Sequence, residues 1–264
     1  MNIIKRELRA HLRSLLIWCG SIIAFIFIMF SEFAGYYNNP EMADVLDSMP
    51  KAMLDAFSIS GANLTTVSGY TSIASVYIYL ALGIYAALLG SSIIAKEERD
   101  KTAEFFLTLP VSRQRVIFGK LTAAVICNIG VNIATTAGIY GATMQYDKMA
   151  DFDRFMFLLM FAIFIIQMIF LSIGMLLSAI MKRYRKSGTY ATGLLLFLYV
   201  VSVFTSLSKD LENLKYLTPF KYFEASYIVR ELSYDTVFVL ISIGIITASI
   251  IGTFLIYPKR DLRI

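Results

Sequence analysis

The densest group of side chains that could do chemistry lies in residues 95–121, AKEERDKTAEFFLTLPVSRQRVIFGKL, which carry ten charges. This stretch separates two long apolar segments, so it would lie at a membrane surface. Its aromatic residues could act as buried anchors in a protein interface, and its charges could form the polar rim around them. The stretch therefore predicts either a helix that lies on lipid or a projection that inserts into another protein.

Catalytic chemistry has little support elsewhere in the chain. An intramembrane enzyme would need paired polar residues at one depth, such as Ser and His or two Asp, and the sole histidine, His11, lies in a charged segment that we expect to be solvated. Cys19 and Cys127 fall inside apolar runs and are interpreted as small buried side chains. A disulfide framework or a metal site is not supported, and no metal ligand is assigned.

A phosphate-binding loop is also absent from the sequence. Gly119-Lys120 is followed by Leu121, and Gln114 stands where the first glycine of such a loop would be. The chain therefore carries no ATPase of its own, and we assign it no cofactor.

The charged stretch predicts a helix with a defined end. Residues 97–109 can form one helix, with Glu97 and Lys101 as a favourable i,i+4 pair. Pro110 ends this helix because it disfavours helical backbone at the preceding residue. Ser112 can then cap a new helix that leads into the next apolar segment.

The elements that position this stretch are predicted membrane spans. The chain is 58% hydrophobic and 16% charged, against about 25% charged in ordinary globular domains. About 20 apolar residues cross a bilayer as a helix. Six runs meet this length, at about 15–35, 70–95, 118–142, 155–181, 188–207 and 237–257, so we expect an all-α polytopic membrane protein with a single transmembrane domain over 1–264.

Three further elements are predicted around the spans. Residues 2–16 have the pattern of an amphipathic helix that lies at the interface before the first span. The third span has small residues along one side, which predicts close packing within the bundle or a subunit contact. The segment between the fifth and sixth spans, 208–236, predicts short helices half-buried at the opposite surface.

Charge counting predicts the orientation of the chain. With six spans, both termini lie on one side, and that side holds 17 of the 24 basic residues but only 6 of the 19 acidic ones. Lys and Arg favour the cytoplasmic side of a membrane protein. We therefore expect a multi-pass protein of the cytoplasmic membrane with both termini inside. The basic residues sit in short loops beside the spans, where lipid headgroups meet them, so nucleic acid is not expected as a partner.

The order of residues in the charged stretch resembles the first cytoplasmic loop of the type-2 family of ABC transporter permeases. That family shows an acidic pair, an Arg, Thr-Leu-Glu, a Leu-rich turn, Leu-Pro, Ser-Arg and Gly-Lys. The corresponding runs here are Glu97-Glu98-Arg99, Thr102-Ala103-Glu104, Phe105-Phe106-Leu107, Leu109-Pro110, Ser112-Arg113 and Gly119-Lys120. Ala103 stands where Leu is usual, and Phe105 and Phe106 stand where Leu is common. Weaker matches are Pro219-Phe220-Lys221-Tyr222-Phe223, the terminal Lys259-Arg260-Asp261-Leu262, and the layout of six spans.

The resemblance implies a coupling helix that sits in a groove of a separate ATPase subunit, which would bind ATP and Mg. The residues implied in ATPase coupling are Glu97, Glu98, Arg99, Thr102, Glu104, Phe105, Phe106, Leu107, Pro110 and Arg113. It also implies a second permease subunit, identical or related, and favours export over import. Two alternatives stay open: a scaffold or sensor subunit that does not transport, and an ion-coupled transporter, which the lack of charges within the spans disfavours.

Overall fold

The computed structural model describes residues 3–39, 48, 63–99, 112–181, 184–207 and 209–259, without the side chains of residues 184, 185, 209 and 210. Six helices in these ranges are long and apolar enough to cross a membrane. They are α1 (Ile3–Phe33), α4 (Val67–Arg99), α6 (Arg113–Ala142), α7 (Phe152–Ile180), α8 (Tyr184–Leu207) and α10 (Thr236–Ile256). Each overlaps one predicted span, and the described residues contain no strand, so the prediction of an all-α polytopic protein is confirmed.

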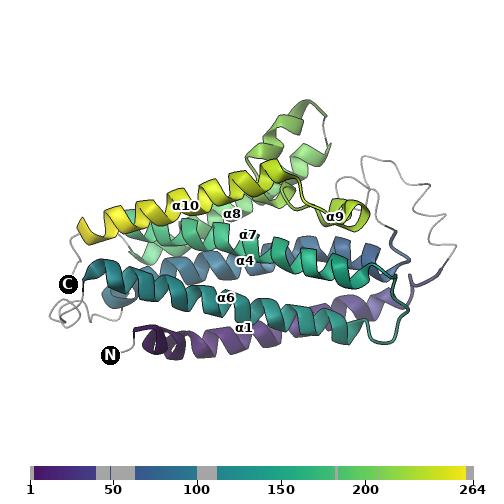
Figure 1. Ribbon diagram of the computed structural model, residues 1–264, viewed down its shortest axis with the longest axis horizontal. Helices are drawn as coiled ribbons and strands as arrows, with labels where there is room; N and C mark the ends of the chain where they lie inside the picture. Colours follow the sequence, from purple (N-terminus) through teal and green to yellow (C-terminus); the bar gives the residue numbers. More distant parts are fainter. Residues whose placement is uncertain are drawn as a thin grey trace.

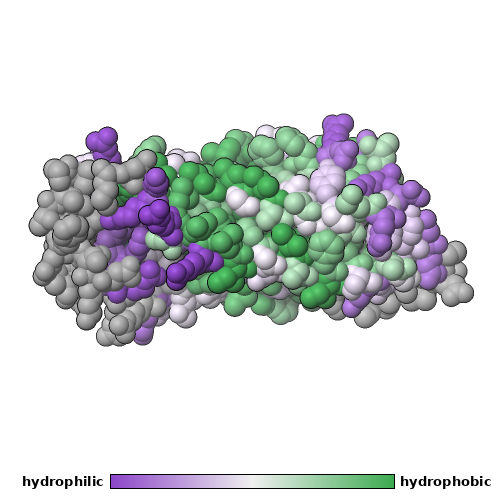
Figure 2. All heavy atoms as spheres, turned by 90° about the horizontal axis from the view of Figure 1, so that it is seen from below, coloured by the Kyte–Doolittle hydropathy of each residue, from purple (hydrophilic) through white to green (hydrophobic). Residues whose placement is uncertain are grey.

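The six helices lie side by side along the long axis of the molecule, and both chain ends lie at the same end of the bundle (Figure 1). We call this the terminal end, and the opposite end, where α9 lies, the distal end. Hydrophobic residues form a belt around the middle of the face in Figure 2, and hydrophilic residues gather towards both ends. This distribution is the one that a bilayer requires of a spanning protein.

Residues 3–33 form one continuous helix, so the predicted interfacial helix and first span are joined in α1. No proline interrupts this segment, and Gly20 sits within the helix without a turn. His11 is buried, with 9% of its surface exposed, and the prediction that it is solvated is wrong. The face of α1 that carries it packs on neighbouring helices instead of facing water.

The helices pack closely at glycines, because the absence of a side chain lets the neighbouring backbone approach. A Cβ on Gly90 of α4 would lie 2.2 Å from the carbonyl oxygen of Leu171 in α7. A Cβ on Gly174 of α7 would lie 2.5 Å from the carbonyl oxygen of Ala87, so the two helices meet backbone to backbone. Gly130 and Gly138 of α6 face side chains of α1. The predicted small-residue side of the third span therefore packs inside the bundle.

The caps and short helices also follow the sequence. The Ser112 hydroxyl accepts a hydrogen bond from the Arg115 backbone N–H at 3.3 Å, which confirms Ser112 as the N-cap of α6. Between α8 and α10 the chain forms η1 (Lys209–Tyr216), η2 (Pro219–Lys221) and α9 (Ala225–Glu231), and η3 (Tyr257–Lys259) follows α10. Phe220, Tyr222 and Phe223 are buried, so this predicted surface segment anchors itself in the protein core.

Candidate functional site: a charged cluster at the terminal end

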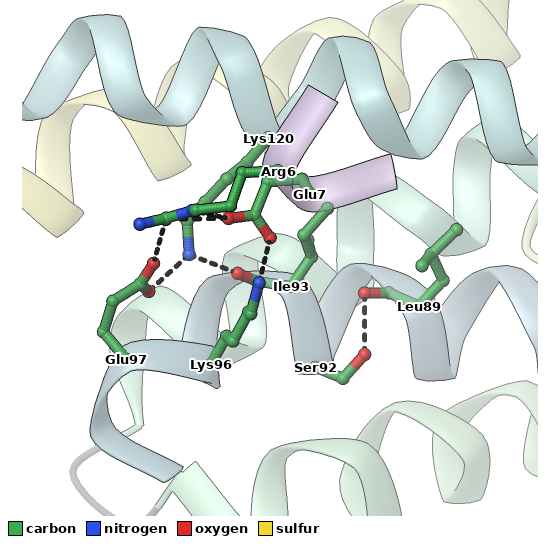
Figure 3. Close-up of polar contacts among 8 residues, drawn as sticks. All are labelled: Arg6, Glu7, Leu89, Ser92, Ile93, Lys96, Glu97 and Lys120. Atoms are coloured by element: carbon green, nitrogen blue, oxygen red, sulfur yellow. Dashed lines mark hydrogen bonds and ion pairs between the residues drawn. The ribbon is translucent and has the colours of Figure 1, made fainter. Parts of the chain in front are cut away.

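Five charged side chains meet at the terminal end of α1, α4 and α6 (Figure 3). We call them the ion cluster: Arg6, Glu7, Lys96, Glu97 and Lys120. They come from the first turns of α1, the last turns of α4 and the third turn of α6. The cluster therefore ties together three separate helices.

Each carboxylate in the ion cluster has two cationic partners. Glu7 binds Arg6 Nη2 at 2.8 Å through Oε1 and Lys96 Nζ at 3.0 Å through Oε2. Glu97 pairs with Lys120 through Oε2 and accepts from Arg6 Nη2 at 3.2 Å through Oε1. Arg6 thus bridges both carboxylates, and this arrangement joins α1 to α4 and α4 to α6.

The innermost members of the ion cluster are shielded from solvent. Glu7 and Lys120 are fully buried, Glu97 is 3% exposed, and Arg6 is 31% exposed. The Lys120 ammonium also donates to the backbone carbonyl of Ile93 in α4. A buried charge is tolerated only when it is paired and hydrogen-bonded, and removing one partner leaves the other uncompensated. The cluster can therefore hold the three helices in one arrangement.

The ion cluster adjoins the stretch predicted to couple to an ATPase. Glu97 lies two residues before the end of α4 at Arg99, and Lys120 lies two turns after the start of α6 at Arg113. Residues 100–111 connect these two helix ends. Any displacement of that connection would act on α4 and α6 where the cluster holds them.

The described members of the predicted coupling set lie in different settings. Glu97 and Glu98 are buried at the end of α4, and Glu97 points into the ion cluster. Arg99 is exposed. The Arg113 guanidinium donates to the backbone carbonyl of Pro258 at 2.9 Å, which fixes the start of α6 against η3. The remaining members lie outside the described residues: Thr102, Glu104, Phe105, Phe106, Leu107 and Pro110.

The sequence pattern did not predict the ion cluster. The expected lack of charges within the spans is wrong at the terminal end, where Lys120 falls inside the predicted span 118–142 and is buried, although the charges of the cluster are paired and lie near the helix ends. A lysine inside a helix of spanning length was the available signal, because such a residue needs a partner. Within the described ranges, no group of three His, Cys, Asp or Glu residues could hold a metal ion.

A comparison with curated proteins finds no matching sequence. The family model described as "ABC-2 family transporter protein" matches residues 1–262. That match covers nearly the whole chain and agrees with the six apolar helices. The chain therefore belongs to the ABC-2 family of transporter proteins, as a multi-pass membrane protein of the permease type.

Proposed function

We propose that this chain is the permease subunit of an ATP-driven exporter in the cytoplasmic membrane, coupled to a separate ATPase through residues 97–113. The family match supports the permease role. The charge asymmetry supports a cytoplasmic location for the terminal end. The sequence contains no phosphate-binding loop, so ATP and Mg would be bound by the partner.

The coupling proposal is based on the ion cluster, which joins the end of α4 to the start of α6, the two helices that flank residues 100–111. Motion of an ATPase has to reach the spans through segments that are rigidly attached to them. Glu97 and Lys120 join the two helices on either side of this connection, and Arg6 extends the link to α1. In this proposal Glu97 acts inside the permease, and the contact with the ATPase is made by the more exposed Arg99 and by Thr102, Glu104, Phe105, Phe106 and Leu107.

The transport step follows from this arrangement. Two permease subunits, identical or related, enclose a route across the membrane. ATP-driven closure of two ATPase subunits moves the coupling segments, and the spans alternate between inward- and outward-facing states. The inference of export is based on the family resemblance.

The test is the double substitution of Phe105→Asp with Phe106→Asp in the complex purified with its ATPase. We expect the ATPase to be lost from the purified permease, because two carboxylates would replace the apolar anchors of the interface. The matched control is Leu214→Asp with Leu217→Asp, which places the same changes on exposed residues at the distal end. Retention of the ATPase at the wild-type yield in the Phe105 and Phe106 variant would show that the assigned docking face is wrong.

A further inference from the structure

His11 is the only histidine of the chain, and it is buried at the terminal end beside the ion cluster. It lies one turn after Glu7 on the same face of α1, about 6 Å further along the helix. The exposed Arg9 and Arg13 flank it, and it precedes the first predicted span, so we place it at the level of the lipid head groups. Histidine is the side chain whose ordinary titration falls at physiological pH.

One nitrogen of the His11 ring is closed off from solvent. Only 9% of the residue is exposed, and Nε2 has no hydrogen-bond partner within the described part of the chain. A neutral imidazole can leave this nitrogen without a proton, whereas an imidazolium carries an N–H on both nitrogens. The buried N–H of a cation costs more free energy than the bare nitrogen of a neutral ring. The surroundings of Nε2 therefore favour the neutral form.

The charges around the ring also oppose a further cation. Lys96 and Arg99 act on the ring from α4 and Lys120 acts on it from α6, against the carboxylate of Glu7 on α1 (Figure 3). Burial is the largest influence and lowers the pKa of His11. Glu7 raises this pKa, and the three cations lower it again.

The wider surroundings of the ring keep the same sign. Arg6, Glu97 and Glu98 also lie at this end of the bundle, and with them the charges are four cations against three carboxylates, a net charge of +1. Ser187 and Gly188 of α8 line the same cavity as His11 without adding a charge. A proton on His11 would therefore add to a group of side chains that is already positive.

The terminal half of α1 is loosely packed on α4. A cavity of about 480 Å³ lies between α1, α4 and α8, and His11 is among the residues that line it. The ion pair of Glu7 with Lys96 joins α1 to α4 at the terminal end. Deeper in the bundle the rings of Trp18 and Tyr85 meet, with their centroids 5.3 Å apart. These contacts, and not a continuous packed surface, hold this part of α1 on α4.

We propose that His11 is an acid-sensitive switch, which in its protonated form loosens the terminal half of α1 from α4. The neutral ring is compatible with the closed arrangement of the ion cluster. The imidazolium repels Lys96 and Lys120 and has no acceptor for the N–H at Nε2, so it is better solvated when α1 moves away and water reaches the ring. This switch concerns the chain alone and does not depend on ATP coupling or on export.

The stability of the chain should follow the uptake of one proton. The pKa of a histidine in an unfolded chain is about 6.5, and that of His11 in the folded chain is lower. Between these two values the unfolded or opened form binds a proton that the closed form does not. The unfolding constant should therefore be independent of this residue above about pH 6.5 and rise by up to about tenfold per pH unit below it.

The chain carries two reporters for the test, since it has one histidine and one tryptophan. The full chain would be purified in detergent through an affinity tag that contains no histidine. NMR of the chain with ¹⁵N-labelled histidine should give a titration midpoint below about pH 6.5. Between about pH 6.5 and 5.5, the unfolding constant from denaturant titrations should rise by up to about tenfold, and acrylamide should reach Trp18 more readily because its contact with Tyr85 opens.

The variants separate His11 from the carboxylates that also titrate in acid. His11→Gln keeps a neutral polar side chain and should remove the rise in both readouts. The matched control adds Ala10→His to His11→Gln, which moves the histidine by one residue to an exposed position. This control should titrate near pH 6.5 and show no rise, because a solvated imidazolium costs nothing there. If His11→Gln does not fold, His11→Met is the second neutral variant, and the wild-type titration midpoint stands by itself.

Three outcomes would overturn the switch. A wild-type midpoint at or above about pH 6.5 would show that the folded chain does not disfavour the imidazolium. A rise in His11→Gln as large as in the wild type would assign the acid sensitivity to carboxylates. An unfolding constant that rises while Trp18 stays equally protected from acrylamide would show a loss of stability without loosening of α1.

Discussion

The two ends of α1, α4 and α6 are held by different forces. At the terminal end, five charged side chains form the ion cluster. At the distal end, aromatic rings converge: Phe33 of α1 lies with its ring centroid 4.8 Å from those of Tyr70 in α4 and Tyr146 after α6. We call Phe30, Phe33, Tyr37, Tyr70 and Tyr146 the aromatic cluster.

This difference indicates where the bundle can switch and where it is anchored. The attraction between paired buried charges depends on their geometry and is lost when one partner is displaced. Such pairs therefore suit an end of the bundle that must transmit a discrete movement. Aromatic packing is spread over many contacts and tolerates small shifts, with each ring pair contributing about 0.5–1.5 kcal/mol beyond its burial. The terminal end, next to the proposed coupling segment, is the end that carries the charges.

The largest effect is expected from Lys120→Met, which breaks the ion cluster at its most buried member. Loss of this cation leaves the buried Glu97 carboxylate with Arg6 alone and should lower the free energy of unfolding by about 3–5 kcal/mol. Denaturant unfolding of the detergent-solubilised chain would measure it. Adding Glu97→Gln should restore much of the loss, and a double variant as unstable as the single one would contradict the pairing.

A comparable loss is expected from Phe33→Ala, which opens the aromatic cluster. Phe33 is fully buried and contacts rings from three segments, so the cavity left behind should lower the free energy of unfolding by about 3–5 kcal/mol. Its control is Phe27→Ala on the same helix, because Phe27 is 50% exposed and faces outward. Equal effects of the two substitutions would show that the aromatic cluster does not anchor the distal end.

A smaller effect is expected from Tyr70→Phe, which keeps the ring but removes its hydroxyl. This hydroxyl donates to the backbone carbonyl of Met29 at 2.7 Å and joins α4 to α1. The substitution should lower the free energy of unfolding by about 1 kcal/mol, the usual net contribution of one hydrogen bond. Tyr77→Phe, at an exposed position of α4, is the control and should leave the unfolding midpoint unchanged.

The smallest effect is expected from Arg6→Gln, at the partly exposed edge of the ion cluster. Because Arg6 is 31% exposed, solvent screens its two ion pairs, and the loss should be about 0.2–1 kcal/mol. The loss should shrink as salt is added, unlike that of Lys120→Met. Arg9→Gln, on an exposed part of α1, serves as the control. A loss as large and as salt-independent as that of Lys120→Met would place Arg6 in the buried part of the cluster.

The sequence predicted the spans, the Ser112 cap and the packing side of α6, because these depend on local pattern. Absence of charge over spanning length, a capping hydroxyl and regularly spaced small residues are all visible within one segment. The sequence did not predict the continuity of α1, because charged residues in the first three turns look the same in an interfacial helix and in the start of a long span.

The ion cluster could not be predicted from local pattern, because it depends on which helices meet. Arg6 and Glu97 lie 91 residues apart, and Glu97 and Lys120 lie 23 residues apart. The charge of Lys120 was plain in the sequence, but its partners were set by the packing of α1 on α6 and of α4 on both.

The most direct test of this account is to determine on which side of the membrane the ion cluster lies. In a chain with Cys19→Ala and Cys127→Ala, single cysteines would be placed at the exposed Gln114, beside the cluster, and at the exposed Ser233, at the distal end. A membrane-impermeant maleimide applied to intact cells should label Ser233→Cys, and Gln114→Cys only after the cells are permeabilised. Labelling of Gln114→Cys in intact cells would put the proposed coupling segment outside the cell and contradict the account.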